Sequence, residues 1–258
     1  MRLIDSHCHF DAAEFDADRA AAYARATVAG IAAQIVPAVD AAAWAKLKHV
    51  CTNHTALYPA YGLHPMYLAE HRPWHLLQLR EWIEREKPVA IGECGLDFFI
   101  ENLDPQLQQH YFDAQLRLAR EFNLPVIVHA RRAVDAVIAS IRRVGGLRGV
   151  VHSFSGSQEQ AAQLHKLGFL LGIGGPITYE RANRLRKLVA SMPLEQLLLE
   201  TDSPDQPGSA HRGQRNEPAY LLEVLHVVAQ LRGVTPEAIA EATAQNAERL
   251  FDLTPRSN

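Results

Sequence analysis

The chain is poor in cysteine: Cys8, Cys51 and Cys94 are the three cysteines among its 258 residues. Their number is odd and no two of them are closely spaced, a pattern that favours neither a disulfide framework nor a cysteine-ligated zinc site. We therefore expect reduced thiols, with Cys8 and Cys94 serving as packing residues.

The sequence also lacks a long apolar run and an excess of positive charge. No uncharged apolar stretch is long enough to span a bilayer, and no basic region followed by an apolar one precedes the first predicted strand. We expect a cytoplasmic protein without a membrane partner, and nothing indicates an obligate protein partner. The formal net charge of −3 gives no overall attraction to nucleic acid, so a polyanion would have to be bound locally.

No low-complexity linker divides the chain, which predicts one domain over residues 1–258. This length is close to the usual size of one α/β barrel. A hydrophobic content of 48% is that of an ordinary globular protein.

Short β-rich runs alternate with longer segments of helical spacing, and the pattern of strand followed by helix recurs along most of the chain. The predicted strands are Leu3–Asp5, Ile31–Val36, Leu57–Gly62, Val89–Glu93, Val126–His129, Val150–His152, Phe169–Ile173 and Leu197–Glu200. The predicted helices are Asp18–Ala29, Ala41–Cys51, Trp74–Arg85, Pro105–Phe122, Ala133–Val144, Gln158–Leu167, Tyr179–Ser191, Pro218–Leu231 and Pro236–Leu250.

This alternation fits either an open doubly wound sheet or a closed barrel. Polar side chains that can bind a metal occur at the ends of most of the strands, namely His7, His9, His64, Glu93, His129, His152 and Asp202. In an open sheet of sequential order, the first and eighth strands would lie roughly 34 Å apart, whereas bonds to a metal ion are about 2 Å long. Closing the sheet brings all these ends to one mouth, and we therefore predict an α/β fold of the TIM-type (β/α)8 barrel.

Some of these residues also indicate a metal site by their local setting. His7 and His9 are two apart in an extended segment, so both imidazoles can point to the same side. Glu93 follows an apolar run, where a carboxylate is costly to bury unless it is paired or bound to a metal. A single histidine such as His129 could equally be a core residue bonded to a backbone carbonyl. The combination favours metal ligands.

Ordered motifs across nearly the whole chain resemble those of the TatD family of metal-dependent hydrolases. They are Ser6-His7-Cys8-His9-Phe10-Asp11, Gly62-Leu63-His64-Pro65, Ile91-Gly92-Glu93-Cys94-Gly95-Leu96-Asp97, Pro125-Val126-Ile127-Val128-His129-Ala130-Arg131, His152-Ser153-Phe154-Ser155-Gly156, Leu199-Glu200-Thr201-Asp202, Arg212-Gly213-Gln214-Arg215-Asn216-Glu217-Pro218 and Asn246-Ala247-Glu248-Arg249-Leu250-Phe251. Two of these regions, Arg131-Arg132 and Asp202-Ser203-Pro204-Asp205, resemble the YjjV-like branch in particular.

The resemblance implies an amidohydrolase-like barrel that holds two, in some members three, divalent ions such as Zn, Mg or Mn. By motif position, His7, His9 and Asp202 would hold one ion together with Glu93, and Glu93 would hold the second with His129 and His152. Glu93 would bridge the ions, because a carboxylate has two oxygens and a neutral imidazole offers one free lone pair. Glu93 and Asp202 are the predicted catalytic residues, with Asp202 acting as ligand and proton shuttle.

Substrate contacts are predicted for His64, Arg131, Arg212 and Arg215. His64 could instead merely shape its turn before Pro65. Asp97 is expected to orient a ligand or a loop. The chain departs from the family pattern at Ser153, where cysteine is usual, and at Arg132, where an acidic residue is common.

Three functions remain open on the sequence alone. The first is a metal-dependent phosphodiesterase or deoxyribonuclease that acts on single-stranded or frayed DNA ends, with the resemblance implying 3′–5′ exonuclease polarity. The second is an amidohydrolase-type enzyme that hydrolyses a small amide, lactone or phosphoester. The third is a non-catalytic metal-binding protein. It is disfavoured because a structural zinc site is closed by four protein ligands, whereas the ligands implied here are shared over two ions and leave room for water.

Overall fold

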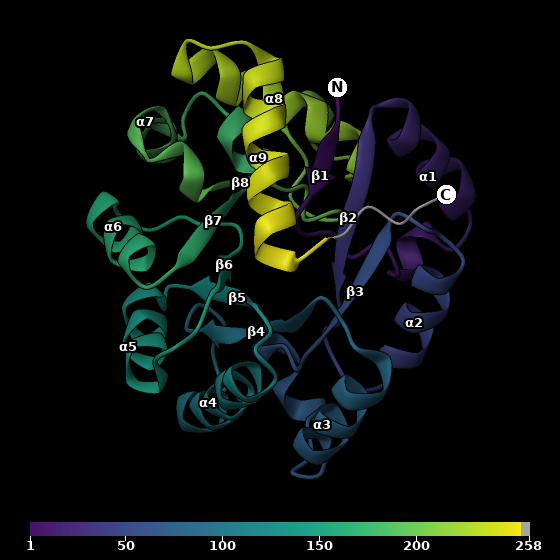
Figure 1. The fold of residues 1–258 in the computed structure, drawn as a ribbon, viewed down its shortest axis with the longest axis vertical. Coiled ribbons are helices and arrows are strands. Elements are labelled where there is room, and N and C mark those ends of the chain that lie inside the picture. Colours follow the sequence, from purple (N-terminus) through teal and green to yellow (C-terminus); the bar gives the residue numbers. More distant parts are fainter. Residues whose placement is uncertain (254–258) are drawn as a thin grey trace.

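A computed structural model describes residues 1–253, and the last residues of the predicted domain, 254–258, lie outside this description. Its strands form one sheet of eight in the order β1 to β8, and each strand is parallel to its neighbours (Figure 1). The strands are β1 (Leu3–Asp5), β2 (Ile31–Pro37), β3 (Leu57–Tyr61), β4 (Ala90–Asp97), β5 (Val126–Arg131), β6 (Gly149–Val151), β7 (Phe169–Ile173) and β8 (Leu197–Leu199).

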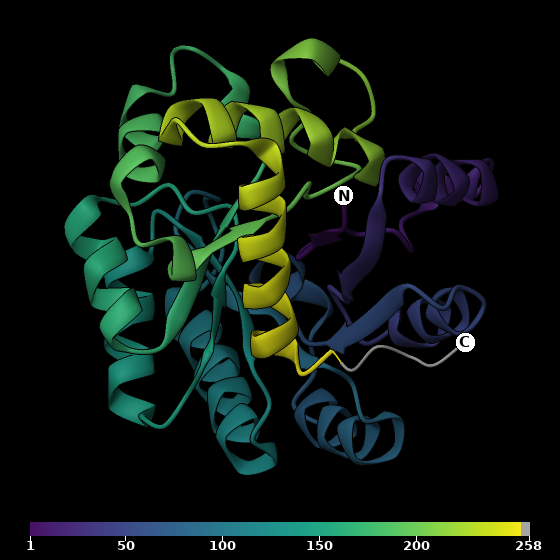
Figure 2. The same ribbon diagram turned by 45° about the horizontal axis from the view of Figure 1, so that its top comes forward.

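Most of the helices surround the ring of strands on its outside, and the last one crosses an end of the ring (Figure 1, Figure 2). The α-helices are α1 (Arg19–Val28), α2 (Trp44–Thr52), α3 (His75–Glu86), α4 (Pro105–Phe122), α5 (Val134–Val144), α6 (Gln158–Lys166), α7 (Asn183–Ser191), α8 (Leu221–Arg232) and α9 (Pro236–Phe251). Short 3₁₀ turns connect them, namely η1 (Ala13–Phe15), η2 (Pro65–Glu70), η3 (Gly175–Thr178), η4 (Leu194–Gln196), η5 (Ser209–His211) and η6 (Pro218–Tyr220). No helix among residues 1–253 is long and apolar enough to cross a membrane.

The core has two parts, because each buried strand has an inner and an outer face. The outer faces pack against the surrounding helices in one large apolar cluster. The inner faces supply small and branched side chains such as Ile4, Ala33 and Ile127, and α9 adds Leu250 and Phe251 to the same cluster. Helix α9 therefore closes the end of the barrel where the strands begin and leaves the end where they finish open.

The barrel closes between β8 and β1 through a mixture of backbone and side-chain hydrogen bonds. The Ser6 N–H donates to the Leu199 carbonyl at 3.0 Å, next to β1 and β8. The buried Asp5 carboxylate accepts from the Thr201 N–H at 3.0 Å and from its hydroxyl at 2.6 Å. The predicted TIM-type barrel is confirmed by this closed arrangement.

The predicted strands agree with the observed ones, and the main differences concern where elements end. Strand β4 continues past Glu93 to Asp97, and β5 continues to Arg131. A glycine permits this extension, since a Cβ on Gly95 would lie 2.0 Å from the His129 carbonyl oxygen. The helix predicted to begin at Tyr179 begins at Asn183, after the 3₁₀ turn that ends at Thr178.

Replacing Thr201 by valine should destabilise the fold. Valine has nearly the same shape as threonine but no hydroxyl, so the buried Asp5 carboxylate loses a hydrogen-bond donor. We expect a loss of about 1–3 kcal/mol in the free energy of unfolding, measured by urea denaturation of the metal-free protein. The exposed Thr27→Val serves as control and should change stability far less. A Thr201→Val protein as stable as the wild type would contradict closure through Asp5.

Candidate metal centre

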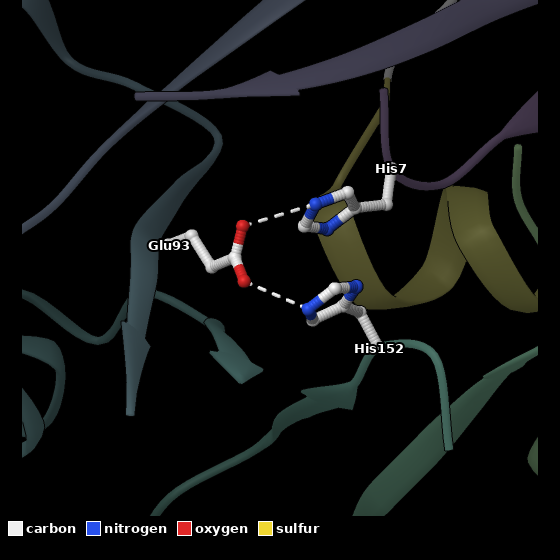
Figure 3. Close-up of side chains that lie close together, drawn as sticks. All are labelled: His7, Glu93 and His152. Atoms are coloured by element: carbon white, nitrogen blue, oxygen red, sulfur yellow. Dashed lines mark ion pairs between the residues drawn. The ribbon is translucent and has the colours of Figure 1, made fainter. Parts of the chain in front are cut away.

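The Glu93 carboxylate, which β4 carries, lies at the centre of the open end of the barrel and is 1% exposed. Figure 3 shows His7 and His152 beside each other at the end of this carboxylate, with one ring directed at each oxygen. Oε2 lies 3.1 Å from His7 Nε2 and 3.4 Å from His9 Nε2. Oε1 lies 2.7 Å from His152 Nε2 and 3.2 Å from His129 Nδ1. The two oxygens therefore face two different groups of donors, as a bridging carboxylate requires.

The first donor group consists of His7, His9 and Asp202, whose ligand atoms lie within 4.8 Å of one another. The two Nε2 atoms are 3.3 Å apart, and Asp202 Oδ1 lies 3.4 Å from His7 and 3.6 Å from His9. A tetrahedral ion with bonds of about 2.0–2.1 Å keeps its donors about 3.3 Å apart. The observed spacing fits a divalent cation between these atoms.

The second donor group, His129 and His152, faces the other oxygen of Glu93, Oε1. His129 Nδ1 and His152 Nε2 are 3.3 Å apart, again the separation expected of two ligands of one ion. Imidazole and carboxylate donors suit Zn or Mn, and the carboxylates also suit Mg. The residues of the predicted ligand set thus come together in groups able to hold metal ions, while the number and identity of the ions stay predictions.

Neighbouring groups orient three of these donors. His129 Nε2 lies 2.9 Å from Asp97 Oδ2, and His9 Nδ1 lies 3.2 Å from the Pro37 carbonyl. Such partners fix which ring nitrogen carries the proton, and so leave the other free to bind a cation. Asp202 Oδ2 accepts a hydrogen bond from the Gln206 side chain, which leaves Oδ1 directed at His7 and His9.

His64, one of the residues predicted at the mouth of the barrel, also lies beside Glu93 and His129. Its Nδ1 accepts the Met66 N–H at 3.1 Å, so the neutral ring carries its proton on Nε2. That Nε2 lies 2.9 Å from Glu93 Oε1 and can donate to it. His64 therefore fits a hydrogen-bond donor better than a metal ligand, and its predicted contact with substrate stays a prediction.

Two buried side chains that sequence reasoning missed hold the His64 loop. His71 Nε2 lies 2.9 Å from the His64 carbonyl. Gln115 bonds both the N–H and the carbonyl of Leu63, at 2.8 and 3.1 Å. Gln115 has no signal in the sequence because Leu63 lies 52 residues earlier, whereas His71 lies only seven residues after His64. Gln206 was also missed, although it lies four residues after Asp202.

The histidines around Glu93 respond differently to its charge. Burial opposes ionisation of Glu93, but the surrounding histidines, His152 first, hold its pKa well below the usual range. Burial lowers the pKa of His7, and the neighbouring His152 adds to this. For His9 the bond to Glu93 outweighs burial and raises the pKa to about 9. For His152 the charge of Glu93 outweighs burial and raises the pKa to about 10.

A cavity of about 890 Å³ opens over the cluster at the mouth of the barrel. His9, His64, Glu93, His129, His152 and Asp202 line it. Arg131 also lines it, whereas Arg212 and Arg215 do not. The Arg215 guanidinium is bonded to both oxygens of Asp18, at 2.6 and 2.9 Å, and Arg212 is exposed. The predicted substrate contacts of these two arginines stay predictions without support from the geometry of the cavity.

The sulfurs stay outside the cluster, as expected. Cys8 and Cys94 are fully buried, with Cys8 Sγ 3.5 Å from Gln34 Oε1 and Cys94 Sγ 3.8 Å from the Ile127 carbonyl. Strand alternation turns each thiol away from the neighbouring donor.

Comparison with known proteins agrees with this geometry. The sequence profile of the family described as "TatD related DNase" matches residues 4–252. The Escherichia coli K12 protein "Uncharacterized metal-dependent hydrolase YjjV" is 43% identical over 255 residues, which cover 98% of this chain and 98% of that protein. The Citrobacter rodentium protein "3'-5' ssDNA/RNA exonuclease TatD" is 33% identical over 264 residues, 99% of this chain and 100% of that protein. The crystal structure of the E. coli YjjV protein has a TM-score of 0.93 at 42% identity, covering 98% of this chain and 99% of that one.

Replacing Glu93 by glutamine should lower the number of divalent ions bound per chain by at least one. A neutral amide has a single acceptor oxygen, and it no longer screens two cations from each other. The measurement is metal analysis after dialysis, with circular dichroism to show that the fold is retained. Glu86→Gln, which alters a carboxylate paired with Lys48, is the matched control and should bind metal like the wild type. Equal metal content in both variants would contradict the bridging position of Glu93.

Binding of a divalent cation near pH 8 should release protons. His9 and His152, with pKa values of about 9 and about 10, are largely protonated in the metal-free protein at this pH. Each must lose its proton to offer a lone pair, so the affinity should rise with pH up to these values. Calorimetric titration in buffers of different ionisation enthalpy counts the protons. Metal binding without proton release between pH 7 and 8 would show that the rings are already neutral.

Proposed function

Because this chain belongs to the TatD related DNase family, we propose that it is a metal-dependent hydrolase that cleaves phosphodiester bonds at the ends of single-stranded or frayed DNA. The observation that carries the proposal is the position of Glu93, whose two oxygens face separate donor groups at the bottom of an open cavity. Two divalent ions held in this way lower the pKa of a water and stabilise the charge that develops on the phosphodiester oxygens.

The protein's own residues would position the reactants and move the proton. Glu93 keeps the two donor groups at a fixed separation. Asp202 lies at the wall of the cavity with a carboxylate of raised pKa, mainly because it is buried, which suits a group that accepts a proton from the attacking water and returns it to the leaving oxygen. His64 also lines the cavity, where its Nε2–H would exchange Glu93 Oε1 for a phosphate oxygen when substrate binds.

Several features favour a strand end over a continuous duplex. The cavity is enclosed by the carboxyl ends of the strands, so the reacting bond must enter it. A net charge of −3 supplies too few cationic contacts to neutralise the phosphates of a long duplex. Removal of nucleotides from the 3′ end is proposed because the Citrobacter rodentium relative is named as an exonuclease of that polarity. The predicted cytoplasmic location accords with such a substrate.

A second candidate is hydrolysis of a small amide, lactone or phosphoester. The observation that favours it is the cavity volume of about 890 Å³, which lies within the range of small-molecule pockets, about 300–1,000 Å³. The same donor groups would serve either reaction.

A linear single-stranded oligonucleotide should be shortened stepwise, whereas a covalently closed circle of the same sequence should be left intact, because a circle has no end to enter the cavity. Gel electrophoresis of labelled substrates measures both, and a chelator should abolish the reaction. Rapid cutting of the circle would rule out end entry. Failure on both substrates, with turnover of small esters, would support the second candidate.

A further inference from the structure

Exposed apolar side chains gather on one side of the cavity mouth. Most of the large ones in the described chain lie in the loops that follow β3 and β4 and in the first turns of α3 and α4: Met66, Tyr67, Trp74, Leu77, Phe98, Phe99 and Leu107. The others are Met1, Val28 and Val234. In a barrel these loops and first helical turns lie at the end where the strands finish, which is the mouth. Exposed apolar patches of this kind mark surfaces that bind a partner or a ligand.

Within this sector two phenylalanines and two arginines form a cluster, which we call the aromatic–arginine cluster: Phe98, Phe99, Arg131 and Arg132. The Arg131 guanidinium carbon lies 3.8 Å from the centre of the Phe99 ring, and that of Arg132 lies 4.6 Å from it. Among residues 1–253 neither guanidinium has a carboxylate partner, so both keep their donors available. The Phe98 ring is 41% exposed and stacks on no other aromatic ring or cation among residues 1–253.

Hydrogen bonds anchor the loop that carries Phe98 and Phe99 and link it to the donors around Glu93. Asp97 Oδ1 accepts the N–H groups of Phe99 and Ile100 at 2.9 and 3.1 Å, while its Oδ2 lies 2.9 Å from His129 Nε2. Gln108 bonds the Asp97 N–H and carbonyl at 2.8 and 2.9 Å. One carboxylate therefore fixes both the loop and a donor next to Glu93. A surface held in place before binding loses little entropy when a ligand arrives.

Charge on the far side of the mouth indicates how a polyanion would lie. The cavity is lined there by Asp11, Glu14 and Asp205, from the segments that follow β1 and β8. In a ring of eight strands, β8 stands opposite β4. Lys46 also lines the cavity but is paired with Asp16 at 2.9 Å. Phosphates next to the reacting one would be repelled by the acidic side and attracted to Arg131 and Arg132.

We infer that the aromatic–arginine cluster is the subsite for a nucleotide next to the reacting phosphate of single-stranded nucleic acid. Its base stacks on the exposed Phe98 ring and on the guanidinium planes that lie over Phe99, and its phosphate bonds to the edges of those guanidinium groups. This inference rests on the proposed function and adds the path of the nucleic acid, which would run over the loops that follow β4 and β5. Aromatic rings and arginine planes are the surfaces on which proteins stack unpaired bases. Arginine also bonds phosphate oxygens through its planar fork of donors.

The test compares wild-type holoenzyme with the double variant Phe98→Leu/Phe99→Leu, which keeps apolar volume at exposed positions and removes the rings. The measured quantity is the ratio of kcat/KM for a short oligothymidylate to kcat/KM for bis(p-nitrophenyl) phosphate, which has no base to stack. The ratio should fall roughly 5-fold to 150-fold, the range for loss of stacking on one base. Val28→Ala, at an exposed site on the end of α1, is the control and should leave the ratio unchanged.

An abasic nucleotide, placed in turn at each position near the digested end, gives a second readout. At one position the abasic nucleotide should slow the wild type about as much as the double substitution does. It should slow the double variant much less, because that variant has no phenyl ring on which the missing base would have stacked. The inference would be wrong if both proteins had the same kcat/KM ratio, or if an abasic nucleotide slowed both to the same extent. The exposed apolar side chains at the mouth would then fit a surface that binds another protein. If the wild type hydrolyses the small ester but no oligonucleotide, the proposed function itself fails and the subsite with it.

Discussion

The open end of the barrel depends on the contact between one buried carboxylate and the imidazoles around it. An isolated carboxylate in the interior would cost several kcal/mol, yet Glu93 carries its charge at 1% exposure. It can do so because different strands bring His7, His64 and His152 to within 3.1 Å of its oxygens. The same carboxylate separates the donors into two groups, one at each oxygen. The contacts that stabilise the buried charge of Glu93 therefore also set the layout of the candidate metal centre.

The rest of the structure keeps these donors in place. Helix α9 fills the end of the barrel where the strands begin, and the chemistry is thereby confined to the other end. Polar side chains then fix individual atoms: Asp97 holds His129, and Gln206 holds one oxygen of Asp202. A donor whose second atom is bonded cannot rotate away, and its remaining lone pair keeps one direction. Pre-organisation of this kind reduces the reorganisation that binding an ion or a substrate would otherwise require.

Most of the fold was accessible from the sequence, since strand and helix periods are local properties. The barrel itself followed from the strand-end residues His7, Glu93 and Asp202, which an open sheet of sequential order could not bring to one ion. Interpretation was weaker for side chains on loops. Arg215 is in a family motif, but its partner is Asp18, nearly two hundred positions earlier in the chain, and the cavity lies elsewhere. The sequence order of two residues on different loops carries no information about whether they meet.

Spacing and hydrophobic pattern were enough to predict the alternation of strands and helices, and the residue types at the strand ends were enough to predict that the sheet closes. The hydrogen-bond partners and the orientation of those residues became known only from the tertiary structure. The proton on His64 is placed by the Met66 N–H, the orientation of His129 is set by Asp97, and the two oxygens of Glu93 face different donor groups. These are matters of which lone pair faces which atom at about 3 Å, and only the folded chain fixes distances on that scale.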